Sequence, residues 1–264
     1  MPEISEVRIM SEFINEKSDG LVFTKIEKNP VHKSKTALDV SYQSFKIHAT
    51  SKGKELQLVL SSGSEKKKMT LTMGMSGNWN FTLPGEKIPK HTHLMFHSPG
   101  GILGLNDVRR FARWEWRDWN SERGPDPSRE FSEFRENVLK GIFEKKKLFE
   151  KPIYEVLMDQ EYFNGVGNYL RAEILGRIDL DPKMSARSYL ELANDTFFDV
   201  LKKTIDESYI LGGGQFKDWY NEMDRKGEKW ESFQEWMRFY FNKETCFPLK
   251  DKKDRVFWIN KKWL

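Results

Sequence analysis

Residues 157–175 read LMDQEYFNGVGNYLRAEIL, and this stretch decides how the second half of the chain is interpreted. Gly165 and Gly167 flank Val166 between two segments whose apolar residues recur at helical spacing. Asn168 follows at a position where its side chain is expected to cap the second helix. A glycine turn that opens a helix presents backbone N–H groups at the positive end of the helix dipole, which suits a DNA phosphate. A plain helix–turn–helix connector is the alternative, and these residues alone leave both interpretations open.

The segments on either side of this turn also have helical patterns. FSEFRENVLKGIF at 131–143 predicts one helix, and further helices are expected over about 152–163, 186–209 and 232–241. The end of the chain, with its RVFWI run, predicts a β-hairpin over 239–264. The second half is therefore expected to be a helical domain that ends in a hairpin.

Nearer the start of the chain the pattern is different. A short amphipathic helix follows Ser5, and from about 21 to 120 apolar and polar residues alternate in short runs separated by Gly, Pro and Ser. KELQLVL at 54–60 is one such run, with its leucines on one face. Many short strands of this kind predict a β-sandwich or barrel.

These patterns predict an α+β fold with two domains. A β-sandwich with a leading helix is expected over 1–121, and the polar, proline-containing ERGPDPSRE at 122–130 is the predicted linker. A helical domain over 131–238 and a hairpin over 239–264 complete the chain.

Composition excludes several classes of protein. The chain has 44 basic and 40 acidic residues, and its basic cluster LKDKKDRVFWINKKWL at 249–264 suits a nucleic acid, although solvated surface lysines are the simpler alternative. One cysteine, Cys246, allows no disulfide within the chain. No run approaches the ~20 apolar residues of a membrane span, and the N-terminus has no apolar signal region.

The five histidines all lie in the first 97 residues, so the second half has no Cys or His cluster for a structural zinc ion. His91 and His93 have the alternating spacing of a strand, and a metal pair there is an alternative to ordinary contacts. No metal ion is expected.

The first residues, MPEISEV, raise a chemical question. Removal of Met1 would leave Pro2 with a free secondary amine, whose pKa near 7.7–8.0 leaves a useful neutral fraction at pH 7. Such an amine can act as a nucleophile, and an inert, cleavable terminus is the alternative.

Five stretches, in this order along the chain, resemble motifs of the Fpg/Nei DNA glycosylases. They are MPEISEV, SKGKELQLVL, MGMSG, DVRRFARW and LMDQEYFNGVGNYLRAEIL. The last resembles the helix–two-turns–helix signature of that family. A C-terminal hairpin without metal ligands, ending DKKDRVFWI, resembles the endonuclease VIII-like members with a zinc-less finger.

The resemblance implies that Pro2 is the nucleophile and that Glu3 is a general acid and base, a role that suits a carboxyl group with a raised pKa. A solvent-facing acid is the alternative, and it applies better to Glu6, which also matches a second acid of the family. Lys54 matches the catalytic lysine. Lys52 is expected on the same strand face, so the strand alone does not choose between the two lysines.

The resemblance also assigns residues that would hold DNA. Arg255 matches the arginine of the finger, which grips a phosphate. Met75, Arg109 and Phe111 match the residues that fill the space left by a flipped base, although Met and Phe on strands more often belong to a core. DNA contacts are implied for His91 and for the helical turn, namely Gly165, Gly167 and Asn168.

Two departures from the family pattern concern the site. Ile4 and Ser5 replace the usual small or proline residues after Pro2 and Glu3. Gly214, in LGGGQF at 211–216, stands where some relatives carry a long basic residue, which puts base selectivity in doubt.

The sequence therefore predicts a monomeric, bifunctional DNA glycosylase and abasic-site lyase that acts on oxidised bases, pyrimidines favoured, in damaged double-stranded DNA. No cofactor and no membrane are expected, and the location is an intracellular compartment that contains DNA. A non-catalytic binder of damaged DNA with the same fold is the alternative. A second alternative is an RNA- or ribosome-binding protein that uses only the helical turn.

Overall fold

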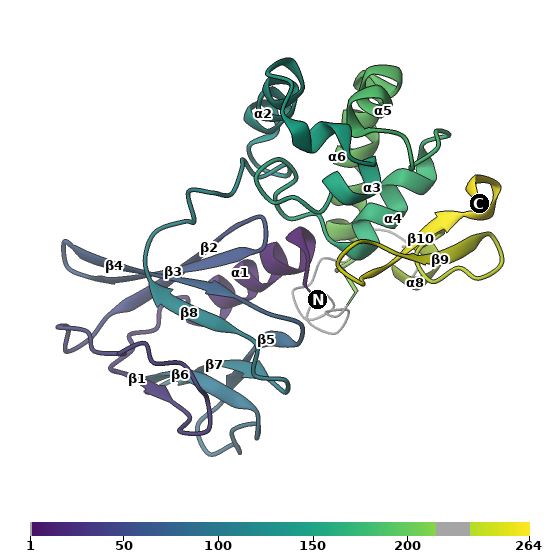
Figure 1. The fold of residues 1–264 in the computed structure, drawn as a ribbon. Coiled ribbons are helices and arrows are strands. Elements are labelled where there is room, and N and C mark those ends of the chain that lie inside the picture. Colours follow the sequence, from purple (N-terminus) through teal and green to yellow (C-terminus); the bar gives the residue numbers. More distant parts are fainter. Residues whose placement is uncertain (1, 215–232) are drawn as a thin grey trace. The chain divides into compact units, whose positions relative to one another are not determined.

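The computed structural model describes residues 2–214 and 233–264 (Figure 1). They divide into two compact units. The first unit contains Pro2 and most of the chain up to Asn120, and the second contains residues 3–5 and the described chain after Asn120. Helices and antiparallel strands are both present, which confirms the predicted α+β class.

The first unit contains two four-stranded antiparallel sheets and most of helix α1, Ile4–Ser18. One sheet, of order β1-β6-β7-β5, consists of β1 (Lys25–Lys28), β5 (Gly77–Thr82), β6 (Thr92–Ser98) and β7 (Gly101–Asp107). The other, of order β2-β3-β4-β8, consists of β2 (Lys46–Lys52), β3 (Glu55–Ser62), β4 (Glu65–Thr72) and β8 (Arg113–Trp116). Leu56, Leu58 and Leu60 of β3 are fully buried, as their alternation predicted.

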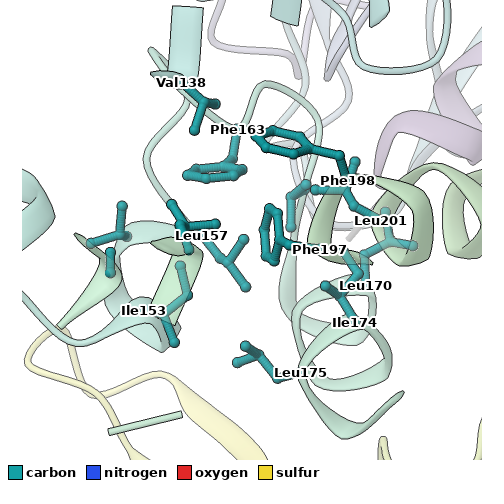
Figure 2. Packing of buried hydrophobic residues seen from close by; sticks show 14 of the residues in the cluster. Val138, Ile153, Leu157, Phe163, Leu170, Ile174, Leu175, Phe197, Phe198 and Leu201 are labelled. Atoms are coloured by element: carbon teal, nitrogen blue, oxygen red, sulfur yellow. The ribbon is translucent and has the colours of Figure 1, made fainter. Parts of the chain in front are cut away.

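The second unit is helical and ends in a hairpin. Its elements are α2 (Phe131–Phe143), the 3₁₀ turn η1 (Lys147–Glu150), α3 (Ile153–Val156), α4 (Asn168–Arg177), α5 (Ala186–Ala193), α6 (Asp195–Ile210), α8 (Phe233–Trp236), β9 (Cys246–Lys250), β10 (Val256–Asn260) and the 3₁₀ turn η2 (Lys261–Trp263). Figure 2 shows the apolar core of this unit, in which Leu170 and Ile174 of α4 lie near Phe197 and Leu201 of α6. Within the described residues no helix is both long and apolar enough to cross a membrane.

Two helices are shorter than their sequence patterns predicted. The segment 186–209 is not one helix, because Asn194 adopts a φ of 47° and separates α5 from α6. With ψ at −135° this backbone lies outside the left-handed helical region that asparagine tolerates, so the break is a strained conformation. The segment 152–163 is helical only in α3, since the Asp159 carboxylate accepts the backbone N–H of Glu161 (2.9 Å) and forms a turn instead.

The predicted helix over 232–241 is also limited, to α8. The reason is Glu173 of α4, a fully buried carboxylate that accepts the backbone N–H groups of Arg238 (3.1 Å), Phe239 (2.9 Å) and Tyr240 (2.9 Å). These donors are turned toward Glu173, so they are not available for helical hydrogen bonds. Burial raises the pKa of Glu173, although the three N–H donors and Arg177 oppose this effect.

Candidate functional site

The turn before α4 is shaped by its two glycines. Gly165 has a φ of 97°, which favours glycine, and its carbonyl accepts the backbone N–H of Ile4 (3.1 Å). At Gly167 the space is limiting, because an added Cβ would lie 2.3 Å from the carboxyl carbon of Glu3. Both glycines are therefore required by this local geometry.

Glu3, near the start of the chain, caps helix α4, which begins at Asn168. Its carboxylate accepts the backbone N–H groups of Gly167 (2.7 Å), Tyr169 (3.0 Å) and Leu170 (3.3 Å). The first backbone N–H groups of a helix have no acceptor within the helix, and the Glu3 carboxylate supplies one. Only 3% of Glu3 is exposed, so the solvent-facing alternative for this residue is wrong.

Asn168 does not cap the helix, contrary to the sequence prediction. The N-cap residue is Gly167, and Asn168 is the first helical residue. Both polar atoms of its side chain form hydrogen bonds. Nδ2 donates to the carbonyl of Val256 in the hairpin, and Oδ1 accepts from the guanidinium of Arg171. The amide predicted to contact a phosphate is thus fixed beside β10, which packs against α4 (Figure 1).

Arg255 follows the turn of the hairpin, where 37% of its side chain is exposed. Its Nε donates to Oδ2 of the buried Asp251 (2.8 Å). A cavity of about 180 Å³ adjoins it, and its walls include Lys151, Lys252 and Lys253. Three carboxyl groups, one of them Asp251, also line this cavity, so Arg255 and the lysines are the groups in it that suit a phosphate.

The first unit carries Pro2, Lys54 and Glu6. Pro2 is buried, and Lys54 lies with Gly53 in the turn between β2 and β3 rather than on a strand. Lys52 ends β2, so the expectation that it shares a strand face with Lys54 is wrong. Glu6 is also buried, which overturns its solvent-facing alternative.

Met75, Arg109 and Phe111 come together on the surface of the first unit. Nη1 of Arg109 lies 3.1 Å from the Met75 sulfur, and its guanidinium carbon lies 4.9 Å from the centre of the Phe111 ring. Met75 is 40% exposed and Phe111 is 50% exposed, so the core alternative is wrong for both. Exposed apolar side chains grouped with an arginine are suitable for entering a base stack.

Asp107, which the sequence reasoning missed, organises these two loops. This buried carboxylate accepts the Ser76 hydroxyl and the backbone N–H of Arg109 (3.2 Å) on Oδ1, and the N–H of Ala112 (2.7 Å) on Oδ2. An aspartate that bonds the backbone two residues ahead is a known turn signal, and Asp107 at the end of β7 carried it.

A buried histidine pair lies beneath the same loops. The ring of His32 stacks on Trp114 at 4.3 Å and lies 5.3 Å from the ring of His93, whose Nε2 is 3.1 Å from the carbonyl oxygen of Asp107. His93 therefore lies beside His32. In the described parts of the chain no group of three or more His, Cys, Asp or Glu side chains is placed to hold a metal ion.

This pair makes the stability of the first unit depend on pH. Burial, with mutual repulsion for His32, lowers the pKa of both histidines below 6.5, despite opposing attraction from Asp107. The unfolded chain therefore binds protons that the folded chain does not, and stability falls as pH drops below 6.5. His32→Phe keeps a ring on Trp114, and we expect it to reduce this fall in urea unfolding between about pH 8 and about pH 5.

The control is His48→Phe, the same substitution at an exposed histidine of β2. We expect it to leave the pH dependence as in the wild type. An identical fall in His32→Phe and the wild type would contradict the assignment.

Two further predicted residues occupy less defined positions. His91 is half-buried, and its carbonyl accepts the backbone N–H of Asp107 (2.9 Å). Gly214 is exposed and follows Gly212 and Gly213, which have φ values of 81° and 64°. The rest of that predicted loop, 215–216, and the predicted removal of the first residue lie outside the described residues.

Comparison with known proteins gives matches along the whole chain. A model of the formamidopyrimidine-DNA glycosylase N-terminal domain matches residues 1–114. Endonuclease 8-like 1 of Homo sapiens is 35% identical over 293 residues, covering 98% of this chain and 72% of that protein. Formamidopyrimidine-DNA glycosylase of Carboxydothermus hydrogenoformans is 28% identical, covering 91% of this chain and 88% of that protein.

Solved structures share the fold. The crystal structure of a complex between the LlFpg protein, a THF-DNA and an inhibitor matches with a TM-score of 0.80, covering 99% of each chain at 20% identity. MutM in complex with DNA containing carbocyclic 8-oxo-G matches with a TM-score of 0.78, covering 98% of each chain at 20% identity. Both units are therefore folded as in these proteins.

Proposed function

This chain belongs to the Fpg/Nei family of DNA glycosylases, and on that premise we propose that it excises oxidised bases from damaged DNA and then cleaves the strand. Oxidised pyrimidines are the proposed preference, and a monomer bound to damaged duplex DNA is the proposed complex. The protein would act in an intracellular compartment that contains DNA. Neither a metal ion nor an organic cofactor takes part in the proposed reaction.

The observation that carries this proposal is the capped position of Glu3. Three hydrogen bonds hold the Glu3 carboxylate on the end of α4, and the backbone N–H of Ile4 donates to the carbonyl of Gly165 (3.1 Å). A nucleophile accelerates a reaction when it is held in place near the atom it attacks. Attachment to a fixed residue supports Pro2 as that nucleophile.

The proposed reaction begins when the Pro2 nitrogen forms a bond to C1′ of a flipped nucleotide and the bond from C1′ to the base breaks. Opening of the sugar gives an iminium ion, which has no second proton to lose and so draws electrons from C2′. Loss of a C2′ proton expels the 3′ phosphate, and a second elimination expels the 5′ phosphate. Water then hydrolyses the remaining iminium ion, which breaks the bond between the sugar and Pro2 and restores the free amine. Glu3 moves the protons at the sugar.

The other predicted residues bind the DNA around this centre. Lys54 and Arg255 are the proposed contacts to phosphates beside the lesion, with Arg255 supporting the second elimination. His91 and the turn at Gly165–Asn168 are the proposed contacts to the backbone. In this proposal residues 1–121 supply the nucleophile, while 131–238 and the finger at 239–264 grip the duplex.

Duplexes that each contain one oxidised base test the proposal directly. We expect base release, strand cleavage that removes the sugar and leaves a phosphate on each DNA end, and a covalent protein–DNA adduct when borohydride reduces the iminium. Binding of damaged duplexes without an adduct would instead support the non-catalytic alternative. Equal binding of damaged and undamaged duplexes would favour the RNA- or ribosome-binding alternative.

Removing the Phe111 ring tests the surface formed by Met75, Arg109 and Phe111. Phe111→Ala leaves the space of a flipped base partly unfilled, so we expect excision from a duplex to slow by about tenfold or more. A lesion in a single strand has less stacking to lose, and its excision should change much less. The measurement is the single-turnover rate on both substrates.

Val108→Ala is the control, because Val108 is an exposed apolar residue in the same loop. We expect rates close to those of the wild type. If Phe111→Ala slowed both substrates equally, or neither, the proposed role of the ring would be wrong.

A further inference from the structure

Asp251 is the most heavily bonded side chain of the hairpin. Its Oδ2 accepts from Nε of Arg255 (2.8 Å) and from Nη1 of Arg171 (3.2 Å). Its Oδ1 accepts the backbone N–H groups of Lys253 (2.8 Å) and Arg255 (3.1 Å). Burial opposes the ionisation of Asp251, but these donors outweigh it and lower its pKa, so the carboxylate is charged at neutral pH.

Arg171 is the buried partner of this carboxylate. Its side chain is completely buried, and its guanidinium also donates to the carbonyl of Tyr154 (3.0 Å) and to Oδ1 of Asn168. The same guanidinium lies over the Phe257 ring at 4.9 Å. An arginine in this position needs a counter-charge, because an unpaired buried charge is strongly destabilising.

The hydrogen bond from Nε of Arg255 to Asp251 determines which part of the Arg255 guanidinium remains available to a ligand. Nε is occupied by Asp251, while in the described residues neither Nη group donates to a protein acceptor. Both Nη groups are thus left for a phosphate, which a guanidinium can bind with two parallel hydrogen bonds. The adjoining cavity of about 180 Å³, which is lined by lysines and by carboxyl groups, gives room for such a group.

We propose that Asp251 is a positioning residue: held by the buried charge of Arg171, it orients Arg255 and connects it through Arg171 to Asn168. This inference rests on the proposed function, because it assumes that Arg255 supports the second elimination. The pair fixes the turn of the hairpin to α4 by charge. Loss of Asp251 would let the guanidinium of Arg255 move, and small displacements of a catalytic group cost large factors in rate.

Two variants separate positioning from folding. Asp251→Asn removes the anchor but leaves Arg171 unpaired, so a loss of stability is expected as well. The double variant Asp251→Asn/Arg171→Met removes both buried charges, and we expect it to recover most of that stability. Arg255 still lacks its carboxylate in the double variant, so the second elimination should remain impaired.

The readout is the ratio of the doubly to the singly eliminated strand product on a duplex with one abasic site. We expect this ratio to fall by about 10- to 100-fold in both variants, with thermal stability followed alongside. Asp254→Asn, the same substitution in the same turn at an exposed carboxylate, should keep the wild-type ratio.

A wild-type ratio in a folded double variant would overturn the inference and leave the proposed function intact. Absence of strand cleavage by the wild-type protein would overturn the proposed function, and the inference with it.

Discussion

A protein with two extra residues, Gly-Ser, placed before Pro2 is expected to bind damaged duplexes and to form no covalent adduct with them. The extension converts the Pro2 nitrogen to an amide, which is not nucleophilic, and moves the terminal amine by up to ~7 Å. In the proposed mechanism one iminium serves both base release and strand cleavage, so we expect the rate of cleavage at a lesion to fall by at least about 1,000-fold. Borohydride trapping and single-turnover cleavage measure the two effects.

The matched control carries Gly-Ser after Leu264, and it should cleave and form adducts as the wild type does. Pro2→Gly adds a finer test, because a primary amine forms an iminium ion that can lose its N–H proton and become a neutral imine, which is a weaker electron sink. Adduct formation should therefore be slower in Pro2→Gly but not abolished. Base release at the wild-type rate by the N-terminally extended protein would exclude Pro2 as the nucleophile.

The second large effect is expected for Glu3→Gln, which lowers both activity and stability. The amide NH₂ group of glutamine would face backbone donors at Gly167, Tyr169 and Leu170, so part of the cap is lost at a cost of about 1–3 kcal/mol. The carboxyl group that we propose moves protons at the sugar is lost as well. We expect base release to slow by about 100- to 10,000-fold.

Measurements well below the melting temperature separate the two losses. A Glu3→Gln protein that is folded and still binds a duplex with an abasic-site analogue, yet releases no base, supports the proposed role. Glu16→Gln is the control, since Glu16 lies on the same helix α1 and is 42% exposed in its side chain. Wild-type base release by Glu3→Gln would contradict a role in proton transfer.

Local patterns were sufficient to predict most of the fold. The alternation of leucines in β3, the apolar spacing in α2 and the glycine turn before α4 each reflect the geometry of one element and are visible over a few residues. Helix lengths were less predictable. The break at Asn194 lies within a continuous helical pattern, and α8 ends where Glu173 takes the N–H groups that a longer helix would use.

The site was harder to predict because its hydrogen bonds join distant parts of the chain. Glu3 was identified from a resemblance to known motifs, but nothing in the sequence near Gly167 shows that this carboxylate caps α4. Asn168 was given that role because asparagine is common at helix starts. Asp107, Arg171 and Asp251 were not singled out, since an isolated charged residue in a loop or helix does not disclose its partner.

Helix α4 has a consequence for protein engineering. Its Arg171 and Glu173 are fully buried charges whose partners, Asp251 and the backbone of 238–240, lie in or just before the terminal hairpin. The hairpin therefore cannot be replaced independently of α4. In a chimera that receives the metal-binding finger of another glycosylase, Arg171 and Glu173 would stay buried without their partners. We expect such a chimera to fold only if α4 is transferred together with the finger.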